Sequence, residues 1–169
     1  GSFSGGSAAA FVKYFNDCNV FCLDVNLTSV KFKSNKINFF GLDSSNLKML
    51  SKFLKNIEDK FSVKKFDIII DDGSHILSDQ LFSINYFYKY LKKGGYYIIE
   101  DYKFPNYFER CNDVNENTID ILIKKLKKNK IIESKILQND TINKLYRSKI
   151  FTYKGRTKIS DIVFFQKKY

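Results

Sequence analysis

The sequence predicts an α/β fold with a doubly wound, mostly parallel sheet that ends in an antiparallel hairpin. Three observations lead to this prediction: short apolar runs alternate with segments of helical periodicity, the apolar runs are almost uninterrupted, and the last third carries a hairpin pattern. The chain has 169 residues, of which 44% are hydrophobic, so it can build one packed core. We therefore expect a single domain over residues 1–169.

The first hundred residues contain the parallel part of the sheet. Runs rich in β-branched and aromatic residues predict four strands, at Val20–Leu23, Ile37–Phe40, Ile68–Ile70 and Tyr96–Ile99. Apolar residues at helical spacing predict helices over about residues 7–15, 45–59 and 77–91. We expect Gly94-Gly95 to end the last of these helices and to turn the chain into the fourth strand.

The C-terminal third has a different pattern. A helix is predicted over 119–130, and strands at Ile150–Tyr153 and 159–165 are expected to form a hairpin around Lys154-Gly155. An antiparallel edge of this kind is common on an otherwise parallel sheet. Residues 103–117 lack periodicity and follow a strand end, so we interpret them as a lid.

Composition limits the setting and the partners. The net charge is +11, but all the cations are Lys except Arg110, Arg147 and Arg156. Arg is the residue favoured for specific phosphate and base recognition, so the pattern favours solvated lysines over a nucleic-acid surface. No apolar run is long enough for a membrane span, no signal-peptide pattern is found, and the three cysteines lack metal-ligand spacing. We expect a cytoplasmic protein without a membrane partner.

Carboxylates follow four of the predicted strands. They are Asp24, Asp43, the pair Asp71-Asp72, and the pair Glu100-Asp101. In an open α/β sheet, ligands bind beyond the carboxyl ends of the strands. Acids that mark the same edge repeatedly therefore predict a binding site there.

The opening Gly1–Ser7 segment is a glycine-rich turn that leads into a helix. Glycines allow a ligand to approach the backbone, and a helix N-terminus favours an anion. Asp24 follows about 20 residues later, where an acid can accept ribose hydroxyls, and Asp43 would meet a base edge. The alternatives are a flexible Gly-Ser terminus and strand-end turns, which Asp also favours.

Asp72, Glu100 and Asp101 form the sharpest cluster. If their strands are neighbours, the strand ends lie about 4.8 Å apart, and the three carboxylates repel one another unless a cation or a proton compensates. Oxygen ligands suit Mg²⁺, Mn²⁺ or Ca²⁺. The alternative interpretation is that these acids cap neighbouring helices.

His75, the one histidine of the chain, lies in the polar loop Asp71–His75 at the same predicted edge. A neutral imidazole can take a proton near pH 7, and a neighbouring carboxylate would orient it. Gly73 permits the turn that brings His75 back toward the strand end. Asp71 would position a ligand or hydrogen-bond the loop.

These segments together resemble the class I S-adenosylmethionine-dependent methyltransferases. The residues are Gly1–Ser7, Asp24, Phe66–His75 and Gly94–Asp101, and more narrowly they resemble the metal-dependent sugar O-methyltransferases of the macrocin and mycinamicin type, grouped with cephalosporin-hydroxylase-like proteins. The resemblance implies a Rossmann-like sheet, S-adenosylmethionine and Mg²⁺ or another hard divalent cation as cofactors, and the hydroxyl of a sugar or small molecule as acceptor. It implies His75 as general base and Asp72, Glu100 and Asp101 as metal ligands. It assigns cofactor binding to Gly1, Ser2, Gly5, Gly6, Ser7, Asp24, Asp43, Ser44 and Asp71.

One departure from the family concerns the sheet. The family's glycine turn follows a first strand, whereas nothing precedes Gly1, so we expect an N-terminally truncated sheet that lacks this strand. Two alternative functions remain open: an RNA methyltransferase, suggested by the lysine excess, and a non-catalytic remnant of the fold, suggested by the missing strand. The sequence leaves the acceptor open, and it is compatible with a homo-oligomer.

Overall fold

The structure is a computed structural model that describes residues 2–113 and 115–168. It divides into two compact units, Gly1–Val63 and Lys64–Tyr169, which are described in turn. Within the described residues, no helix combines the length and apolar character that crossing a membrane requires.

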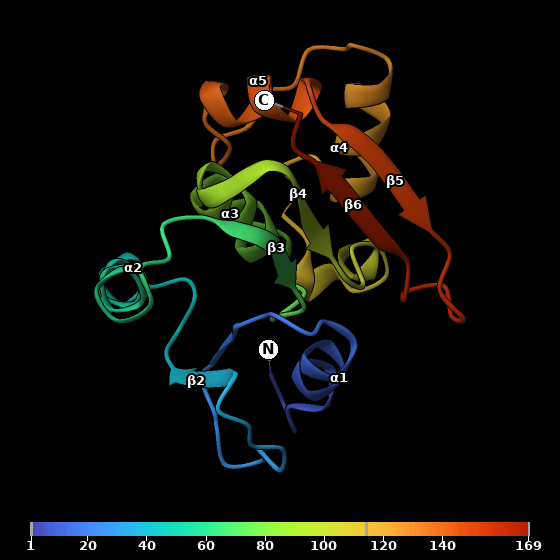
Figure 1. Cartoon of the computed structure of the whole chain (residues 1–169). Coiled ribbons are helices and arrows are strands. Elements are labelled where there is room, and N and C mark those ends of the chain that lie inside the picture. Colours follow the sequence, from blue (N-terminus) through green and yellow to red (C-terminus); the bar gives the residue numbers. More distant parts are fainter. Residues whose placement is uncertain (1, 114, 169) are drawn as a thin grey trace. The chain divides into compact units, whose positions relative to one another are not determined.

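The first unit contains a two-stranded parallel sheet and two helices. Its elements are α1 (Gly6–Tyr14), β1 (Val20–Asp24), β2 (Ile37–Gly41) and α2 (Leu47–Phe61) (Figure 1). The strands pair in register from Val20 opposite Ile37 to Asp24 opposite Gly41, so both end at the same edge. The connection between them carries no helix in the described residues.

Helix α2 shows how local sequence sets an element. Asn46 caps its N-terminus, because the Asn46 side chain accepts hydrogen bonds from the backbone N–H groups of Lys48 and Met49. Leu50, Phe53 and Ile57 recur at helical spacing and are buried on one face. The helix ends after Phe61, where Ser62 adopts a left-handed backbone conformation.

The second unit is built on a four-stranded mixed sheet. Its strands are β3 (Phe66–Asp71), β4 (Leu91–Ile99), β5 (Lys149–Tyr153) and β6 (Ile162–Gln166), and their order across the sheet is β3-β4-β6-β5 (Figure 1). Strands β3 and β4 are parallel, whereas β6 is antiparallel to both β4 and β5. Tyr97, Ile99, Val163 and Phe165 alternate with more exposed neighbours and are fully buried in the core.

The described residues of this unit also form three α-helices and three short 3₁₀ turns. Helix α3 (Leu77–Phe87) connects β3 with β4 and packs on both strands, and α4 (Ile119–Lys127) contacts α5 (Asn139–Tyr146). The 3₁₀ turns are η1 (Tyr88–Tyr90), η2 (Phe104–Asn106) and η3 (Glu109–Cys111). Each α-helix buries an apolar face, including Leu81 and Ile84 of α3 and Leu122 and Leu126 of α4.

The predicted fold class is confirmed: the chain is an α/β protein with parallel strand pairs and a C-terminal antiparallel hairpin, in a shortened Rossmann-like arrangement. The described strands form two sheets rather than one. Helix α5 was not predicted, and the helix predicted over 77–91 ends earlier, at Phe87. The segment expected to be an irregular lid contains the turns η2 and η3.

The prediction for Gly94-Gly95 was wrong. Both residues lie inside β4 rather than between a helix and a strand. The pairing of β3 with β4 shifts register at this point, and a Cβ on Gly95 would lie 2.6 Å from the backbone oxygen of Asp67. Here the glycine permits the close approach of two backbones at an irregularity in the sheet. Because glycine is common both at helix ends and at such irregularities, the sequence alone did not distinguish them.

Candidate active site

The neighbouring strands β3 and β4 bring two acidic loops together. Asp71 is paired with Ile99 at the ends of the strands, and the backbone N–H of Glu100 donates to the backbone oxygen of Asp71 over 3.0 Å. The turn that carries Asp72 and His75 therefore begins beside the segment that carries Glu100 and Asp101. Parallel pairing, which the apolar character of both strands favours, is what places the two loops at one edge.

His75 lies between two of these carboxylates. Its Nε2 is 3.8 Å from Oδ1 of Asp72 and 4.0 Å from Oδ2 of Asp101. The His75 side chain is 22% exposed, so the imidazole is partly shielded yet open to solvent. Nε2 is therefore the ring nitrogen that faces the carboxylates, and it could exchange a proton with a group held among them.

The backbone at this site is strained at two positions. His75 has a φ of 57° and Asp101 has a φ of 51°, both in the left-handed region that side chains other than glycine rarely adopt. Such conformations persist only where the surrounding structure enforces them, and they are concentrated at functional sites. The side chains of these two residues also approach each other, with Nε2 of His75 4.0 Å from Oδ2 of Asp101.

The carboxylates disfavour one another's charge. Partial burial raises the pKa of Glu100, and the negative charges of Asp72 and Asp101 raise it further, while His75 opposes the shift. Partial burial likewise raises the pKa of Asp101, with His75 opposing and Asp72 adding to the increase. A cation among these groups would relieve the repulsion.

The donor set matches the chemistry of a hard divalent cation. Three carboxylates supply oxygen ligands, which suit Mg²⁺ and Mn²⁺. In the part of the chain that the structure describes, no group of three or more His, Cys, Asp or Glu side chains is arranged so that it could hold a metal ion. The site thus brings the donors to one edge, and the roles of Asp72, Glu100 and Asp101 as ligands remain predictions.

Asp71 is set deeper than its neighbours. Burial raises the pKa of the Asp71 carboxyl, and the Ser83 hydroxyl and the Gly73 N–H oppose this shift. Ser83 in turn shares a hydrogen bond of 2.6 Å with the buried Tyr97 hydroxyl. Among the described groups, Oδ2 of Asp71 has no hydrogen-bond partner. Asp71 therefore anchors the start of the loop from inside the unit, and its predicted role in cofactor binding remains untested.

The glycine-rich turn lies in the first unit. Gly5 precedes α1 with a φ of 81°, a backbone conformation that favours glycine, and a Cβ there would also lie 3.1 Å from Cζ of Phe39, a close contact. Gly6 begins α1, and Ser7 is exposed in its first turn. Gly1, which was also predicted to bind the cofactor, lies outside the described residues.

Asp24 holds this turn to the end of β1. Its Oδ2 accepts hydrogen bonds from the N–H groups of Ser2 (2.6 Å) and Phe3 (3.1 Å), and its Oδ1 accepts one from Asn26 (3.0 Å). Partial burial alone would raise the pKa of Asp24, but the backbone donors together hold it below its usual value. The carboxylate is therefore charged and fixed in place beside the turn.

Asp43 and Ser44 lie in the exposed loop between β2 and α2. Oδ1 of Asp43 accepts from both the N–H (2.8 Å) and the hydroxyl (2.7 Å) of Ser45, and these bonds lower the pKa of Asp43. This is the turn-forming role that Asp commonly plays at strand ends. The N–H of Leu42 donates to the backbone oxygen of Asp24, which joins this loop to the end of β1.

Sequence reasoning missed the aromatic neighbour of His75. The ring of Phe104 packs against the imidazole with a centroid distance of 5.4 Å and an angle of 39°. Phe104 follows Asp101 by one short turn, because its N–H donates to the backbone oxygen of Asp101. The signal available in the sequence was an aromatic residue just after the acidic pair, in a segment without periodicity.

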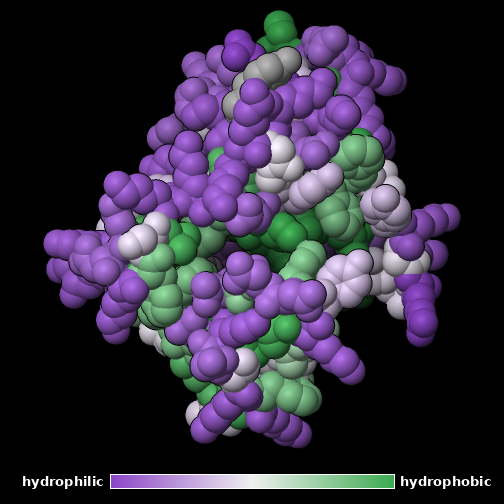
Figure 2. Space-filling model, in the orientation of Figure 1, coloured by the Kyte–Doolittle hydropathy of each residue, from purple (hydrophilic) through white to green (hydrophobic). Residues whose placement is uncertain are grey.

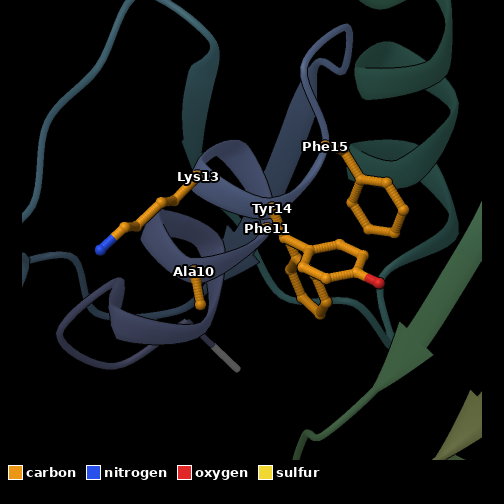
Figure 3. A pocket seen from close by; sticks show the side chains of 5 residues that line it. All are labelled: Ala10, Phe11, Lys13, Tyr14 and Phe15. Atoms are coloured by element: carbon orange, nitrogen blue, oxygen red, sulfur yellow. The ribbon is translucent and has the colours of Figure 1, made fainter.

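A separate apolar hollow lies beside α1. It has a volume of about 600 Å³ and is lined by Ala10, Phe11, Lys13, Tyr14 and Phe15. Figure 3 shows the three rings gathered on one side of the helix, with Lys13 pointing the other way. None of the predicted site residues lines it. Elsewhere, hydrophilic side chains cover much of the face shown in Figure 2.

Two curated relatives are similar in sequence. The chain is 50% identical over 36 residues to the L-olivosyl-oleandolide 3-O-methyltransferase of Streptomyces antibioticus, a match that covers 21% of this chain and 9% of the relative. It is 29% identical over 103 residues to the 8-demethyl-8-(2-methoxy-alpha-L-rhamnosyl)-tetracenomycin-C 3'-O-methyltransferase of Streptomyces olivaceus, covering 57% of this chain and 23% of the relative. No family model matches the chain.

The fold is similar to that of the MycE methyltransferase from the mycinamycin biosynthetic pathway. The structure of MycE with Mg and SAH aligns with a TM-score of 0.65 at 22% identity, over 97% of this chain and 41% of that chain. The complex with Mg, SAH and Mycinamycin VI aligns with a TM-score of 0.67, also at 22% identity, over 97% of this chain and 40% of that one. At this identity the likeness shows a shared fold.

The resemblance predicted from the sequence is confirmed by both comparisons, since the two curated relatives are O-methyltransferases with a sugar in their names and MycE is a methyltransferase whose structure contains Mg and SAH. The chain spans less than a quarter of the length of the curated relatives and about two fifths of the MycE chain.

Proposed function

We propose that this chain carries the core of an O-methyltransferase that depends on S-adenosylmethionine and Mg²⁺, and that methylates a hydroxyl of a sugar or small-molecule acceptor. The observation that supports this most directly is the placement of the His75 imidazole within 4.0 Å of carboxylates from two loops. The similar proteins, whose names or structures include O-methylation, Mg and SAH, support the same class of reaction.

The residues of the second unit would handle the acceptor. When bound, the cofactors supply an electrophilic methyl group and a positive charge that lowers the pKa of the acceptor hydroxyl. Asp72, Glu100 and Asp101 would hold the cation. His75 would accept the hydroxyl proton at Nε2 as the new C–O bond forms and the bond between methyl and sulfur breaks.

The residues of the first unit would hold the methyl donor. Gly5 and Gly6 lie at the N-terminus of α1, where backbone N–H groups would face an anionic part of the ligand. Asp24, kept ionised by its backbone donors, retains lone pairs on both oxygens that can accept ribose hydroxyls. Asp43 and Ser44 lie at the end of the neighbouring strand and would contact the base.

The single histidine makes a direct test of the metal site practicable. A chain labelled with ¹³C-histidine gives one set of imidazole signals in NMR, and they belong to His75. Paramagnetic Mn²⁺ bound by Asp72, Glu100 and Asp101 would broaden those signals at substoichiometric concentration, and excess Mg²⁺ would restore them by competition. Asp72→Asn should abolish the broadening.

Asp140→Asn provides the matched control, because Asp140 is an exposed carboxylate on α5 that forms an ion pair with Lys144. In this variant, Mn²⁺ should broaden the His75 signals as much as in the unsubstituted chain. Transfer of labelled methyl from S-adenosylmethionine to a panel of sugars, with and without a chelator, tests the reaction itself. The metal assignment would be overturned if turnover persisted in the presence of the chelator, or if Mn²⁺ did not broaden the His75 signals.

A further inference from the structure

The hydroxyl of Ser74 forms two hydrogen bonds that span His75. Its Oγ accepts from the backbone N–H of Ile76 over 3.2 Å and donates to Oδ2 of Asp79 over 2.6 Å. The first bond closes the chain around His75, and the second connects this turn to the first turn of α3, where Asp79 lies. The residues on both sides of His75 are therefore joined to a helix through one hydroxyl group.

This arrangement differs from the usual cap at the start of a helix. Ile76 is the N-cap residue of α3, and its hydrocarbon side chain offers no oxygen to the free backbone N–H groups. In a capping box, a side chain at the third helical position accepts directly from the N–H of the N-cap residue. Asp79 is at that position, but the N–H of Ile76 donates to Ser74 and the carboxylate binds the serine hydroxyl. The acid thus reaches the cap through Ser74, and the residue enclosed by these bonds is His75.

Helix α3 gives this hydrogen-bonded group a fixed base. Leu77 is fully buried and Leu81 is 1% exposed, so the first turns of the helix are held in the core. An acid in the first turn also interacts favourably with the partial positive charge of the helix N-terminus. The carboxylate of Asp79 is therefore an anchored acceptor for the Ser74 hydroxyl.

His75 needs such an anchor because its backbone is strained. Its φ of 57° lies in the left-handed region, which a residue with a side chain keeps only where the surrounding structure enforces it. In this conformation Nε2 is 3.8 Å from Oδ1 of Asp72 and 4.0 Å from Oδ2 of Asp101. A return to an ordinary backbone conformation would redirect the side chain and move Nε2 away from both carboxylates.

We propose that Ser74 and Asp79 are positioning residues, which hold His75 in the left-handed conformation that directs Nε2 to the carboxylates. This inference rests on the proposed function, because it assigns the two residues to the orientation of the candidate base. They act on the reaction through His75 rather than on the acceptor or the cofactors.

The first test uses the whole chain labelled with ¹³C-histidine, without cofactor or cation. The imidazole of His75 packs against the ring of Phe104 at a centroid distance of 5.4 Å, so nuclear Overhauser effects between the two rings report its orientation. Phe104→Leu assigns these effects by removing them. Ser74→Ala and Asp79→Ala should abolish them, whereas Ser74→Thr, which keeps the hydroxyl, should retain them.

Asp140→Ala is the matched control, because it removes an acid from the first turn of another helix of the same unit. It should retain the Overhauser effects between His75 and Phe104. Ser74 is exposed, so its substitution leaves the core intact, and circular dichroism checks the folding of each variant.

Methyl transfer by the same variants is measured separately. Ser74→Ala and Asp79→Ala should lower kcat about 10–100-fold, because a misplacement of about 1 Å at a reacting group can cost about 10²-fold. The KM for S-adenosylmethionine should stay the same, and Ser74→Thr should restore kcat. A substitution that only loosened the fold would not separate the two constants in this way.

The positioning role would be overturned by Overhauser effects that persist in Ser74→Ala and Asp79→Ala, or that are lost equally in Ser74→Thr or in Asp140→Ala. An unchanged kcat in the variants that have lost these effects would overturn it as well. If the effects follow the expected pattern but the unsubstituted chain transfers no methyl group, the proposed function fails, whereas the hydrogen-bonded support of His75 stands.

Discussion

His75 illustrates how far a single residue can be interpreted from its surroundings. Its Nε2 lies within 4.0 Å of carboxylate oxygens of Asp72 and Asp101, and the ring of Phe104 packs against the imidazole at a tilt of 39°. A ring held in this way keeps its orientation, which is what a group that takes a proton from a positioned hydroxyl requires.

His75→Ala is expected to lower the rate of methyl transfer by at least about a hundredfold, because general-base catalysis contributes about 10²–10⁴-fold. The affinity for S-adenosylhomocysteine, measured by calorimetry, should stay the same, since the predicted cofactor residues other than Asp71 lie in the first unit. A variant with lost cofactor affinity and intact turnover would contradict the assigned role.

Gly5→Ala should destabilise the protein by about 1–2 kcal/mol, because alanine disfavours the left-handed backbone and its Cβ would crowd Phe39. Gly6→Ala is the matched control: the nearest atom to its Cβ is 3.7 Å away, and alanine favours a helix. Urea unfolding of both variants checks the prediction. Equal stability of the two would mean that the Gly5 turn is not held as described.

The sequence grouped the strand-end acids at one edge, but it did not indicate their local contacts. Acids that end apolar strands must gather at one edge if the strands are parallel, so Asp72, Glu100 and Asp101 could be grouped from the pattern. The contact of Phe104 with His75 depends on the 3₁₀ turn η2, whose residues have no periodic signal. Hydrogen bonds such as those of Asp24 to Ser2 and Phe3 depend on loop conformations that spacing does not encode.

Among the elements, the hairpin β5–β6 is joined to the segment after Asp101 by one buried carboxylate. Oδ2 of Asp161 accepts from Nζ of Lys103 (2.6 Å), and Oδ1 accepts from the N–H of Gly155 (3.0 Å). The hydrogen bond from Lys103 lowers the pKa of Asp161 most strongly, and burial opposes it. The hairpin thereby supports the segment that carries Phe104.

The depressed pKa of Asp161 fixes the sign of a pH effect. Its contribution to the free energy of unfolding is fully present above the ordinary carboxyl pKa of about 3.8 and is lost as the pH falls through the lower folded value. At pH 7, the free energy of unfolding of Asp161→Asn should therefore be about 2 kcal/mol lower than that of the unsubstituted protein. On acidification, the free energy of unfolding of the variant should fall less steeply, because the variant has no carboxylate at this position to protonate. Urea unfolding at pH 7, 5 and 3 measures this.

The exposed pair of Asp140 and Lys144 on α5 offers the comparison, since Asp140→Asn should change stability by no more than about 0.5 kcal/mol. If both variants lose the same small amount, the contact between Asp161 and Lys103 does not anchor the hairpin.

At the level of elements, strands and the hairpin were predicted well because apolar runs bounded by turn residues leave few alternatives. The errors in secondary structure concern residues that are common in more than one kind of element. Gly94-Gly95 fits a helix end and a sheet irregularity equally by composition, and the close approach of the Asp67 backbone decided between them. Helix α5 is short and was obscured by its polar sequence.

The whole chain is organised as two units, and the predicted base and metal ligands all lie in Lys64–Tyr169. The four-stranded sheet, α3, α4 and α5 give this unit a core of its own, with Leu77, Ile84 and Phe165 fully buried. The division was not predicted, since the sequence shows no linker and the pattern of strands and helices runs on through Val63. The single-domain prediction remains untested.

A fragment of residues 64–169 is expected to fold and to retain the Mn²⁺ response of His75, because every proposed ligand of the cation lies within it. It should lose affinity for S-adenosylhomocysteine, since the glycine-rich turn and Asp24 are absent. Circular dichroism, the ¹³C-histidine signals and calorimetry are the measurements. A fragment with a random-coil spectrum would show that the core of this unit is insufficient alone.

The left-handed backbone at His75 and Asp101 has a consequence for engineering. Each such conformation costs about 1 kcal/mol in a residue that carries a side chain, and glycine at either position would recover it. Selection for heat tolerance alone would therefore favour replacing the very residues to which catalysis is assigned. Libraries aimed at a more robust enzyme should hold positions 75 and 101 constant and seek their gains elsewhere.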